Sequence, residues 1–296
     1  MSEDTFEHKK IRIDEHSGVP TTGHEWDGIE ELNTPLPRWW VWTFWATIIW
    51  GVAYCVVYPA WPTAGGGTKG LFDWNSRTQL SQEVAELQQT RAPILAKIKD
   101  ATLEQIESNP DLLSAARMVG SVAFANNCAG CHGAGGQGSK GYANLNDDDW
   151  IWGGKLADIR QTIEHGVRWE ADKATRSSAM PAFGRDGILT PAQISLLADH
   201  VRTYAELPDA VAPTAEGEKL YAENCAACHG PEGKGNPELG APNLADAIWL
   251  YGGDKASIVN RIANGGGGVM PAWKDRLDET TIKALTVYVH SLGGGQ

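Results

Sequence analysis

The longest apolar run in the chain covers residues 39–58, WWVWTFWATIIWGVAYCVVY, and contains no charged residue. A helix needs about 20 residues to cross a hydrocarbon core of about 30 Å. Aromatic residues stand at both ends of the run, as they do at the two interfaces of a bilayer. The pattern therefore predicts one transmembrane helix over residues 39–59, ended by Pro59 and Pro62.

Two further segments lead from this helix to the rest of the chain. Residues 62–70, PTAGGGTKG, are rich in glycine and predict a flexible exit. Apolar residues recur at helical spacing within residues 78–91 and predict a spacer helix, which Pro93 interrupts. Asn109 followed by Pro110 matches the N-cap and the first residue of a helix, and so marks the start of the next domain.

The remainder of the chain contains one pattern twice. The segment NCAGCHG at 127–133 returns as NCAACHG at 224–230. Each copy continues with glycines, with WIWGG or WLYGG, and with a Met-Pro-Ala-aromatic segment that begins at Met180 or Met270. Each copy ends in a stretch whose apolar residues recur at helical spacing. The pattern indicates a tandem duplication of one domain and not a solenoid, which needs at least three shorter repeats.

The repeated Cys-x-x-Cys-His segment is the attachment signal for c-type haem. Two thiols one helical turn apart can form thioethers with the porphyrin vinyl groups, and the adjacent imidazole can then bind the iron. We therefore predict two covalently bound haem c groups. The predicted attachment residues are Cys128, Cys131, Cys225 and Cys228, and the predicted proximal iron ligands are His132 and His229.

Three other uses of these cysteines fit the sequence less well. A disulfide framework gives no reason for a histidine after the second cysteine in both copies. A zinc site needs four ligands and a second nearby pair, which neither repeat supplies. A thioredoxin-like redox pair belongs in a βαβ pattern, and neither motif has one around it.

Met180 and Met270 are the predicted sixth ligands of the two irons, because they occupy the same place in both repeats. The proline after each methionine keeps the backbone extended, so that the thioether can project as a loop ligand. Coordination by histidine and methionine raises the reduction potential and suits electron transfer. His165 and His200 could in principle replace Met180, but both are predicted to be ordinary polar residues.

The histidine below each iron also has a predicted partner. A proximal histidine normally donates its other ring N–H to a carbonyl oxygen, which fixes the orientation of the ring. Pro242, in GAPNL, stands where this carbonyl is expected in the second repeat, and Ala143, in GYANL, stands there in the first.

These patterns together predict a mostly α-helical chain with one N-terminal transmembrane helix followed by two tandem cytochrome c domains of class I-like fold. The predicted parts are the N-terminal segment 1–38, the transmembrane helix 39–59, a linker and spacer helix 60–109, and the haem domains 110–209 and 210–296.

Composition and charge narrow the interpretation. The net charge is -12, and half of it comes from the first 37 residues. The sequence shows no basic patch of the kind that would predict nucleic-acid binding. The same acidic stretch argues against a cleaved signal peptide, which begins with a short basic region. The anchor is therefore expected to remain. Cys55, within the span, has no histidine beside it and is predicted to be an apolar filler.

The chain resembles the membrane-anchored dihaem cytochrome c subunit of cbb3-type cytochrome c oxidases, the CcoP or FixP family. The resemblance lies in the run at 24–62, in DDDWIWGG at 147–154 and in the tandem haem motifs. It implies a bacterial inner-membrane protein with a cytoplasmic N-terminus and periplasmic haem domains. Electrons would pass from a cytochrome c donor through both haems toward a catalytic subunit in aerobic or microaerobic respiration.

The resemblance also implies partners and limits. The implied partners are the catalytic and monohaem cytochrome subunits of the oxidase, a soluble or membrane cytochrome c donor, and membrane lipid. The chain is not expected to be an enzyme by itself, because oxygen reduction belongs to another subunit of this family's complexes. Two alternatives stay open: an anchored dihaem cytochrome of a dehydrogenase or nitric-oxide reductase, and a dihaem peroxidase, which would need an open iron.

Overall fold

The computed structural model describes residues 11–293 except residues 206, 208–209 and 247. Residues 1–10 of the predicted N-terminal segment and the predicted domain boundary at 209 thus lie outside the described residues. The chain divides into two compact units, residues 1–87 and residues 88–296.

The first unit begins with a β-hairpin that the sequence interpretation did not foresee. Strand β1 (Thr21–Trp26) pairs antiparallel with β2 (Ile29–Leu32). The two residues between them, Asp27 and Gly28, have φ values of 49° and 84°. An Asp-Gly pair with positive φ at both positions is the turn that two-residue hairpin loops favour.

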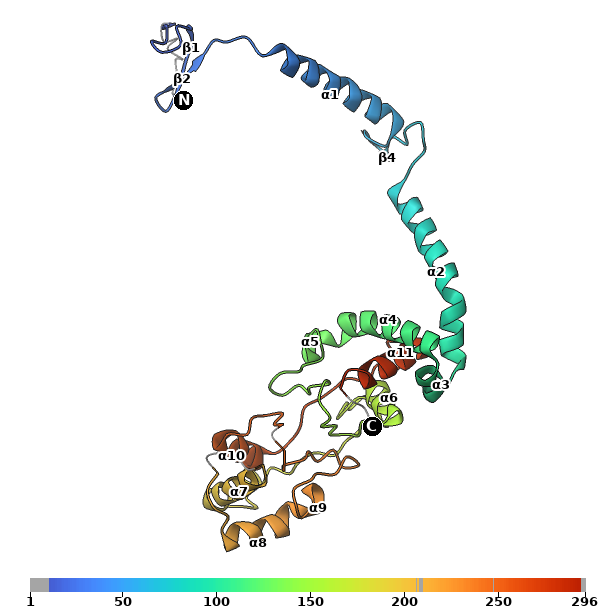
Figure 1. Cartoon of the computed structure of the whole chain (residues 1–296), viewed down its shortest axis with the longest axis vertical. Helices are drawn as coiled ribbons and strands as arrows, with labels where there is room; N and C mark the ends of the chain where they lie inside the picture. Colours follow the sequence, from blue (N-terminus) through green and yellow to red (C-terminus); the bar gives the residue numbers. More distant parts are fainter. Residues whose placement is uncertain (1–10, 206, 208–209, 247, 294–296) are drawn as a thin grey trace. The chain divides into compact units, whose positions relative to one another are not determined.

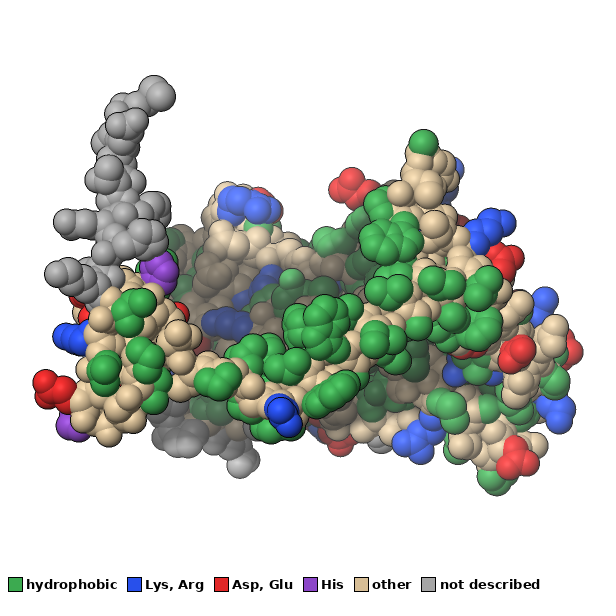
Figure 2. Space-filling view, turned by 90° about the horizontal axis from the view of Figure 1, so that it is seen from above, with side chains coloured by type: hydrophobic (Ala, Val, Ile, Leu, Met, Phe, Trp, Pro, Cys, Tyr) green, Lys and Arg blue, Asp and Glu red, His purple; other side chains and the backbone are tan. Residues whose placement is uncertain are grey.

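Helix α1 (Arg38–Val57) follows and confirms the predicted spanning segment. It is the one helix of the described residues that is long and apolar enough to cross a membrane. None of its side chains is buried within the chain, and Trp40 stacks on Phe44 with ring centroids 5.3 Å apart. Hydrophobic side chains accordingly form a band along α1 (Figure 2). Such a helix needs lipid or other membrane helices around it.

The segment predicted to be a flexible exit after α1 forms a short hairpin in the structure. Strands β3 (Pro62–Thr63) and β4 (Gly66–Gly67) form a tight turn, and the chain then returns to the end of the helix. The amides of Leu71 and Phe72 donate to the carbonyl oxygens of Val56 and Val57 at 3.1 and 3.2 Å. The last carbonyls of a helix have no partner within the helix, so this return satisfies two of them.

Helix α2 (Ser76–Asp100) is longer than predicted, because it continues through Pro93. A proline inside a helix costs about 3 kcal/mol through a lost hydrogen bond and a clash. The continuation brings Ile98 to a fully buried position beside Ile106, which is also fully buried. Burying one such side chain contributes about 1.5 to 3 kcal/mol, so core packing offsets the cost of the proline.

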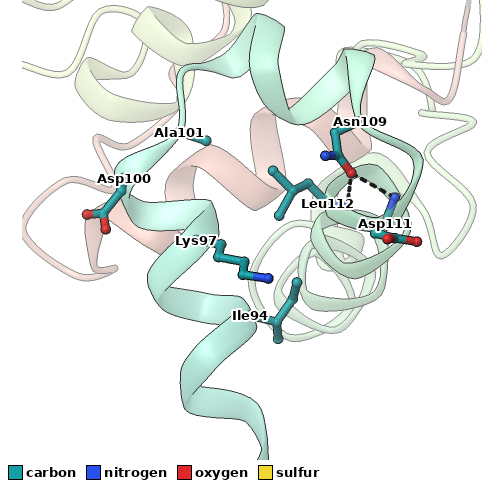
Figure 3. A pocket seen from close by; sticks show the side chains of 7 residues that line it. All are labelled: Ile94, Lys97, Asp100, Ala101, Asn109, Asp111 and Leu112. Carbon is teal, nitrogen blue, oxygen red and sulfur yellow. Dashed lines mark hydrogen bonds between the residues drawn. The ribbon is translucent and has the colours of Figure 1, made fainter.

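The second unit continues with α3 (Leu103–Ser108) and α4 (Pro110–Asn127). The predicted N-cap is confirmed, because the Asn109 side-chain oxygen accepts hydrogen bonds from the amides of Asp111 and Leu112 (Figure 3). A groove of about 520 Å³ lies between this cap and the end of α2, lined in part by Ile94 and Lys97. None of the predicted haem-binding residues lines it.

The two repeats contain the same series of helices, and both predicted terminal helices are present. The first repeat holds α4, α5 (Ala129–His132), α6 (Leu156–His165) and α7 (Pro191–Tyr204). The second repeat holds α8 (Ala215–Asn224), α9 (Ala226–His229), α10 (Lys255–Asn264) and α11 (Glu279–His290).

The repeats exchange their terminal helices. Helix α11 of the second repeat packs against α4 and α6 of the first, and α7 of the first packs against α8 and α10 of the second (Figure 1). The α4–α11 crossing is close: a Cβ atom on Gly120 would lie 2.4 Å from the carbonyl oxygen of Ala284. The predicted division at 209/210 follows the sequence repeat, whereas the hydrophobic cores beside Cys128 and around Cys225 each combine residues of both repeats.

Candidate functional site

The two Cys-x-x-Cys-His segments form the short helices α5 and α9, which directly follow α4 and α8. The amide of His132 donates to the carbonyl oxygen of Cys128 at 3.0 Å, and that of His229 donates to Cys225 at 2.9 Å. We call the surroundings of His132 the first site and those of His229 the second site. Each turn brings two thiols and one imidazole together, as haem attachment requires.

The thiols differ from those of redox-active cysteine pairs. Burial raises the pKa of Cys128 and of Cys225 to about 11, and the second cysteine of each motif adds to the rise. Those second cysteines, Cys131 and Cys228, are exposed. Redox-active Cys-x-x-Cys pairs instead have a thiol whose pKa is lowered. The thiol environment therefore disfavours the thioredoxin-like alternative.

Each imidazole is held by one ring nitrogen. The Nδ1 atom of His132 lies 2.9 Å from the carbonyl oxygen of Ala143, and the Nδ1 atom of His229 lies 3.0 Å from that of Pro242. A carbonyl oxygen can only accept, so Nδ1 carries the proton in both rings and Nε2 is left to bind iron. The sequence interpretation identified both carbonyls. Burial lowers the pKa of His229, which favours the neutral ring that a metal needs.

The two methionine segments lie at the site of the other repeat. Met270 packs on the core that also contacts Cys128 and Ala129, in the first site. Met180 packs on the core that contains Cys225, in the second site. The backbone fixes both segments, because Met270 is bridged to Val167 and Met180 to Gly266. Each site therefore combines a motif from one repeat with a methionine from the other.

Two tryptophans test whether these sites fit a haem. The indole Nε1 atoms of Trp150 and Trp249 are buried and have no hydrogen-bond partner among the described residues. They hold equivalent places in WIWGG and WLYGG, and Gly154 and Gly253 lie against the two indoles. A buried N–H without an acceptor is costly, by about 1 to 3 kcal/mol. A haem brings two propionate carboxylates, which are acceptors of the kind these donors lack.

The two histidines considered as alternative ligands have other partners. His165 Nδ1 lies 3.0 Å from Asp172 Oδ2. His200 is buried, and its Nε2 atom lies 3.2 Å from the hydroxyl oxygen of Tyr204. The tryptophan donors were missed as functional residues, although their repetition in both copies was the available signal.

The arrangement suits electron transfer by two haems. A haem would supply reversible one-electron chemistry here, and the histidine of each motif and one methionine are the residues that would bind its iron. The two cysteines of each motif would attach this group, the backbone carbonyl would orient the imidazole, and the apolar core would cover the iron. Among the described residues, no group of three or more His, Cys, Asp or Glu side chains could hold a separate metal ion.

Comparison with known protein families agrees with this geometry. Residues 18–65 match the N-terminal domain of cytochrome oxidase-cbb3, FixP. Residues 118–205 match cytochrome c, and residues 212–289 match cytochrome c oxidase, cbb3-type, subunit III. The matches thus cover the hairpin with the spanning helix and each of the two repeats.

Similar proteins extend over almost the whole chain. The cbb3-type cytochrome c oxidase subunit FixP of Azorhizobium caulinodans is 59% identical over 285 residues, which cover 96% of each chain. The FixP subunit of Bradyrhizobium diazoefficiens is 53% identical and covers 96% of this chain and 98% of its own. The CcoP subunit of Cereibacter sphaeroides is 46% identical and covers 94% of this chain and 96% of its own.

Proposed function

Because the chain belongs to the FixP and CcoP family of cbb3-type cytochrome c oxidase subunits, we propose that its two sites relay electrons through axial ligands drawn from both repeats. The protein is an electron-transfer subunit with two covalent haem c groups, and oxygen is reduced on another subunit of the oxidase. Its partners include the catalytic and other subunits of that complex. The dehydrogenase, nitric-oxide reductase and peroxidase alternatives have no support in these relatives.

The proposed residues of each site follow from its geometry. In the first site, Cys128 and Cys131 attach the haem, and His132 and Met270 are the axial ligands. In the second site, Cys225 and Cys228 attach the haem, and His229 and Met180 are the axial ligands. The single observation that carries this assignment is that each methionine packs on the core of the site formed by the other repeat.

We further propose an orientation and a donor. Helix α1 anchors the chain in lipid with the N-terminus in the cytoplasm, and both haem sites face the periplasm. A soluble or membrane-bound cytochrome c donates electrons there. The net negative charge of the chain favours a basic donor, but charge attraction fades beyond a Debye length of about 8 Å at physiological ionic strength. Lasting association with the oxidase therefore depends on the anchor.

A truncation tests the relay. A chain without residues 1–62, exported with a cleavable signal, should bind two haems and accept electrons from reduced cytochrome c. Membranes that contain only this fragment should lose donor-driven oxygen consumption, and the oxidase core should purify without it. Full oxygen uptake with the soluble fragment at ordinary concentration would show that the protein acts as a free carrier.

A further inference from the structure

Arg168 lies between the two segments that carry the proposed methionine ligands. Its Nε atom donates to the carbonyl oxygen of Gly268 at 2.8 Å. Its Nη1 atom donates to the carbonyl oxygen of Ser178. Ser178 stands two residues before Met180, and Gly268 stands two residues before Met270. One guanidinium therefore bonds equivalent carbonyls in both methionine segments.

The surroundings hold Arg168 in this position. Its amide donates to the carbonyl oxygen of Arg176 at 2.7 Å, and its φ is 50°, a value that residues other than glycine adopt at a cost in energy. The Cζ atom lies 5.9 Å from the centre of the Trp152 ring. A Cβ atom on Gly267 would lie 2.4 Å from the same Cζ, so the Met270 segment passes directly against the guanidinium.

We propose that Arg168 is a positioning residue that clamps both methionine segments and so stabilises both methionine–iron bonds. This inference rests on the proposed axial ligands. The planar guanidinium can donate to two carbonyls at once in fixed directions, whereas a lysine ammonium is a point charge on a flexible stem. Each bond is also charge-assisted and hence stronger than a bond between neutral groups. Loss of this one side chain should therefore loosen both sites together.

Displacement of methionine by imidazole measures the clamp. The full chain is purified in its oxidase complex, and the sulfur-to-iron absorption band near the red end of the spectrum is followed as imidazole is added. In the M270A variant only Met180 of this chain contributes to the band, and in the M180A variant only Met270 does. The imidazole midpoint is the imidazole concentration at which half of the band is lost. We expect Arg168→Asn to lower this midpoint about tenfold both in the M270A chain and in the M180A chain, because each methionine segment loses one charge-assisted bond. Asparagine is chosen because it tolerates positive φ.

A conservative variant separates geometry from charge. Arg168→Lys keeps the positive charge but cannot reproduce the fork, so at least one imidazole midpoint should fall severalfold. This variant also maintains the test if the asparagine variant does not assemble. Unchanged midpoints in Arg168→Lys would then overturn the clamp.

Two control variants probe neighbouring ion pairs. Lys255→Ala removes a 2.6 Å ion pair with Asp199 that also joins the repeats but lies outside both methionine segments, and it should leave both midpoints unchanged. Lys274→Ala removes a 2.9 Å ion pair with Asp172 and should lower only the midpoint of Met270.

The outcomes are distinct. The shared clamp predicts that Arg168→Asn lowers the imidazole midpoint about tenfold at each site. Midpoints within about twofold of those of the wild-type residue would overturn it. A shift at only one site would overturn it as well. If M180A and M270A do not each remove one part of the absorption band, the axial ligands of the proposed function are wrong instead.

Discussion

Val167 and Met270 exchange both of their backbone hydrogen bonds, each amide donating to the carbonyl oxygen of the other at 2.9 Å. Val167 directly follows the turn that ends α6 in the first repeat, and Met270 begins the segment MPAW of the second, which matches MPAF of the first. The bridge therefore fixes the second repeat's methionine beside the first repeat's helices. The bridge supports the proposed exchange of axial ligands between the repeats.

Removing one haem should reveal which methionine serves the other. With Cys128 and Cys131 both replaced by alanine, the chain should retain only the haem of the second site. Its sulfur-to-iron absorption band should survive M270A and disappear with M180A, because Met180 packs on the core around Cys225. The opposite result would mean that ligation follows the sequence repeats. The complementary chain without Cys225 and Cys228 should show the reverse dependence.

The buried indoles of Trp150 and Trp249 should each affect the reduction potential of one haem only. Trp150→Phe keeps the ring packing but removes the N–H donor, so the propionate charge at the first site is less compensated. That charge favours the oxidised iron, and the reduction potential of the first haem should fall while that of the second stays constant. Trp249→Phe should do the same at the second site. Redox titration checks both, with the exposed Trp61→Phe as control.

The ion pair between Asp172 and Lys274 should make stability depend on pH. The hydrogen bond from Lys274, followed by that from the amide of Ala174, holds the pKa of Asp172 below its usual range. A lowered carboxyl pKa stabilises the fold above the unfolded-state value of about 3.9 and loses this effect as the pH falls toward the folded-state value. Asp172→Asn should therefore lower the denaturant midpoint near neutral pH and have much less effect in strong acid.

A surface ion pair is the matched control for that experiment. Glu232 and Lys234 are paired at 2.6 Å, but both side chains are more than two-thirds exposed. Exposed pairs contribute about 0 to 1 kcal/mol. Glu232→Gln should thus change the midpoint little at any pH. An equal effect of the two substitutions would show that the Asp172 pair has no special role.

The close helix crossing gives a steric test of the exchanged fold. Gly120→Ala would place a Cβ atom 2.4 Å from the Ala284 carbonyl oxygen, so α4 and α11 would have to separate. Overpacking of this kind costs about 1 to 3 kcal/mol. At the equivalent Gly217 the nearest atom is a side-chain oxygen of Thr214 at 3.2 Å, and Gly217→Ala should cost less. Chemical denaturation of the two variants compares them directly.

The proposed orientation follows from where haem is attached. Covalent attachment of haem c takes place outside the bacterial cytoplasm, so both motif segments must be exported. Protease added to spheroplasts should digest the haem-bearing part and spare a tag at the N-terminus. Digestion of the tag with protection of the haems would contradict both the orientation and the haem assignment.

The sequence predicted the individual elements of the fold better than it predicted which elements pack against one another. The spanning helix, the Asn109 cap and the carbonyls that orient His132 and His229 each depend on a local pattern, and each is present. The continuation of α2 through Pro93 was not predictable, because it depends on burial of Ile98 in a distant core.

The exchange of helices was not predictable for a related reason. Both repeats present a glycine at the same place in their first helix, Gly120 and Gly217, and an apolar helix at their end. Either terminal helix could pack on either glycine by pattern alone. The bond from Arg168 to the Gly268 carbonyl distinguishes the two arrangements, but it joins residues 100 positions apart in sequence.

The proposed exchange of methionine ligands has a consequence for biogenesis. In the proposed orientation the part of the chain after α1 is exported, and His132 emerges first, then Met180, then His229, and Met270 last. In the proposed first site, His132 is exported well before its partner Met270. In the proposed second site, Met180 is exported before His229. With the proposed ligands, the site that begins first is completed last, so a chain that ends after the first repeat would contain one haem motif and only the methionine proposed for the other site.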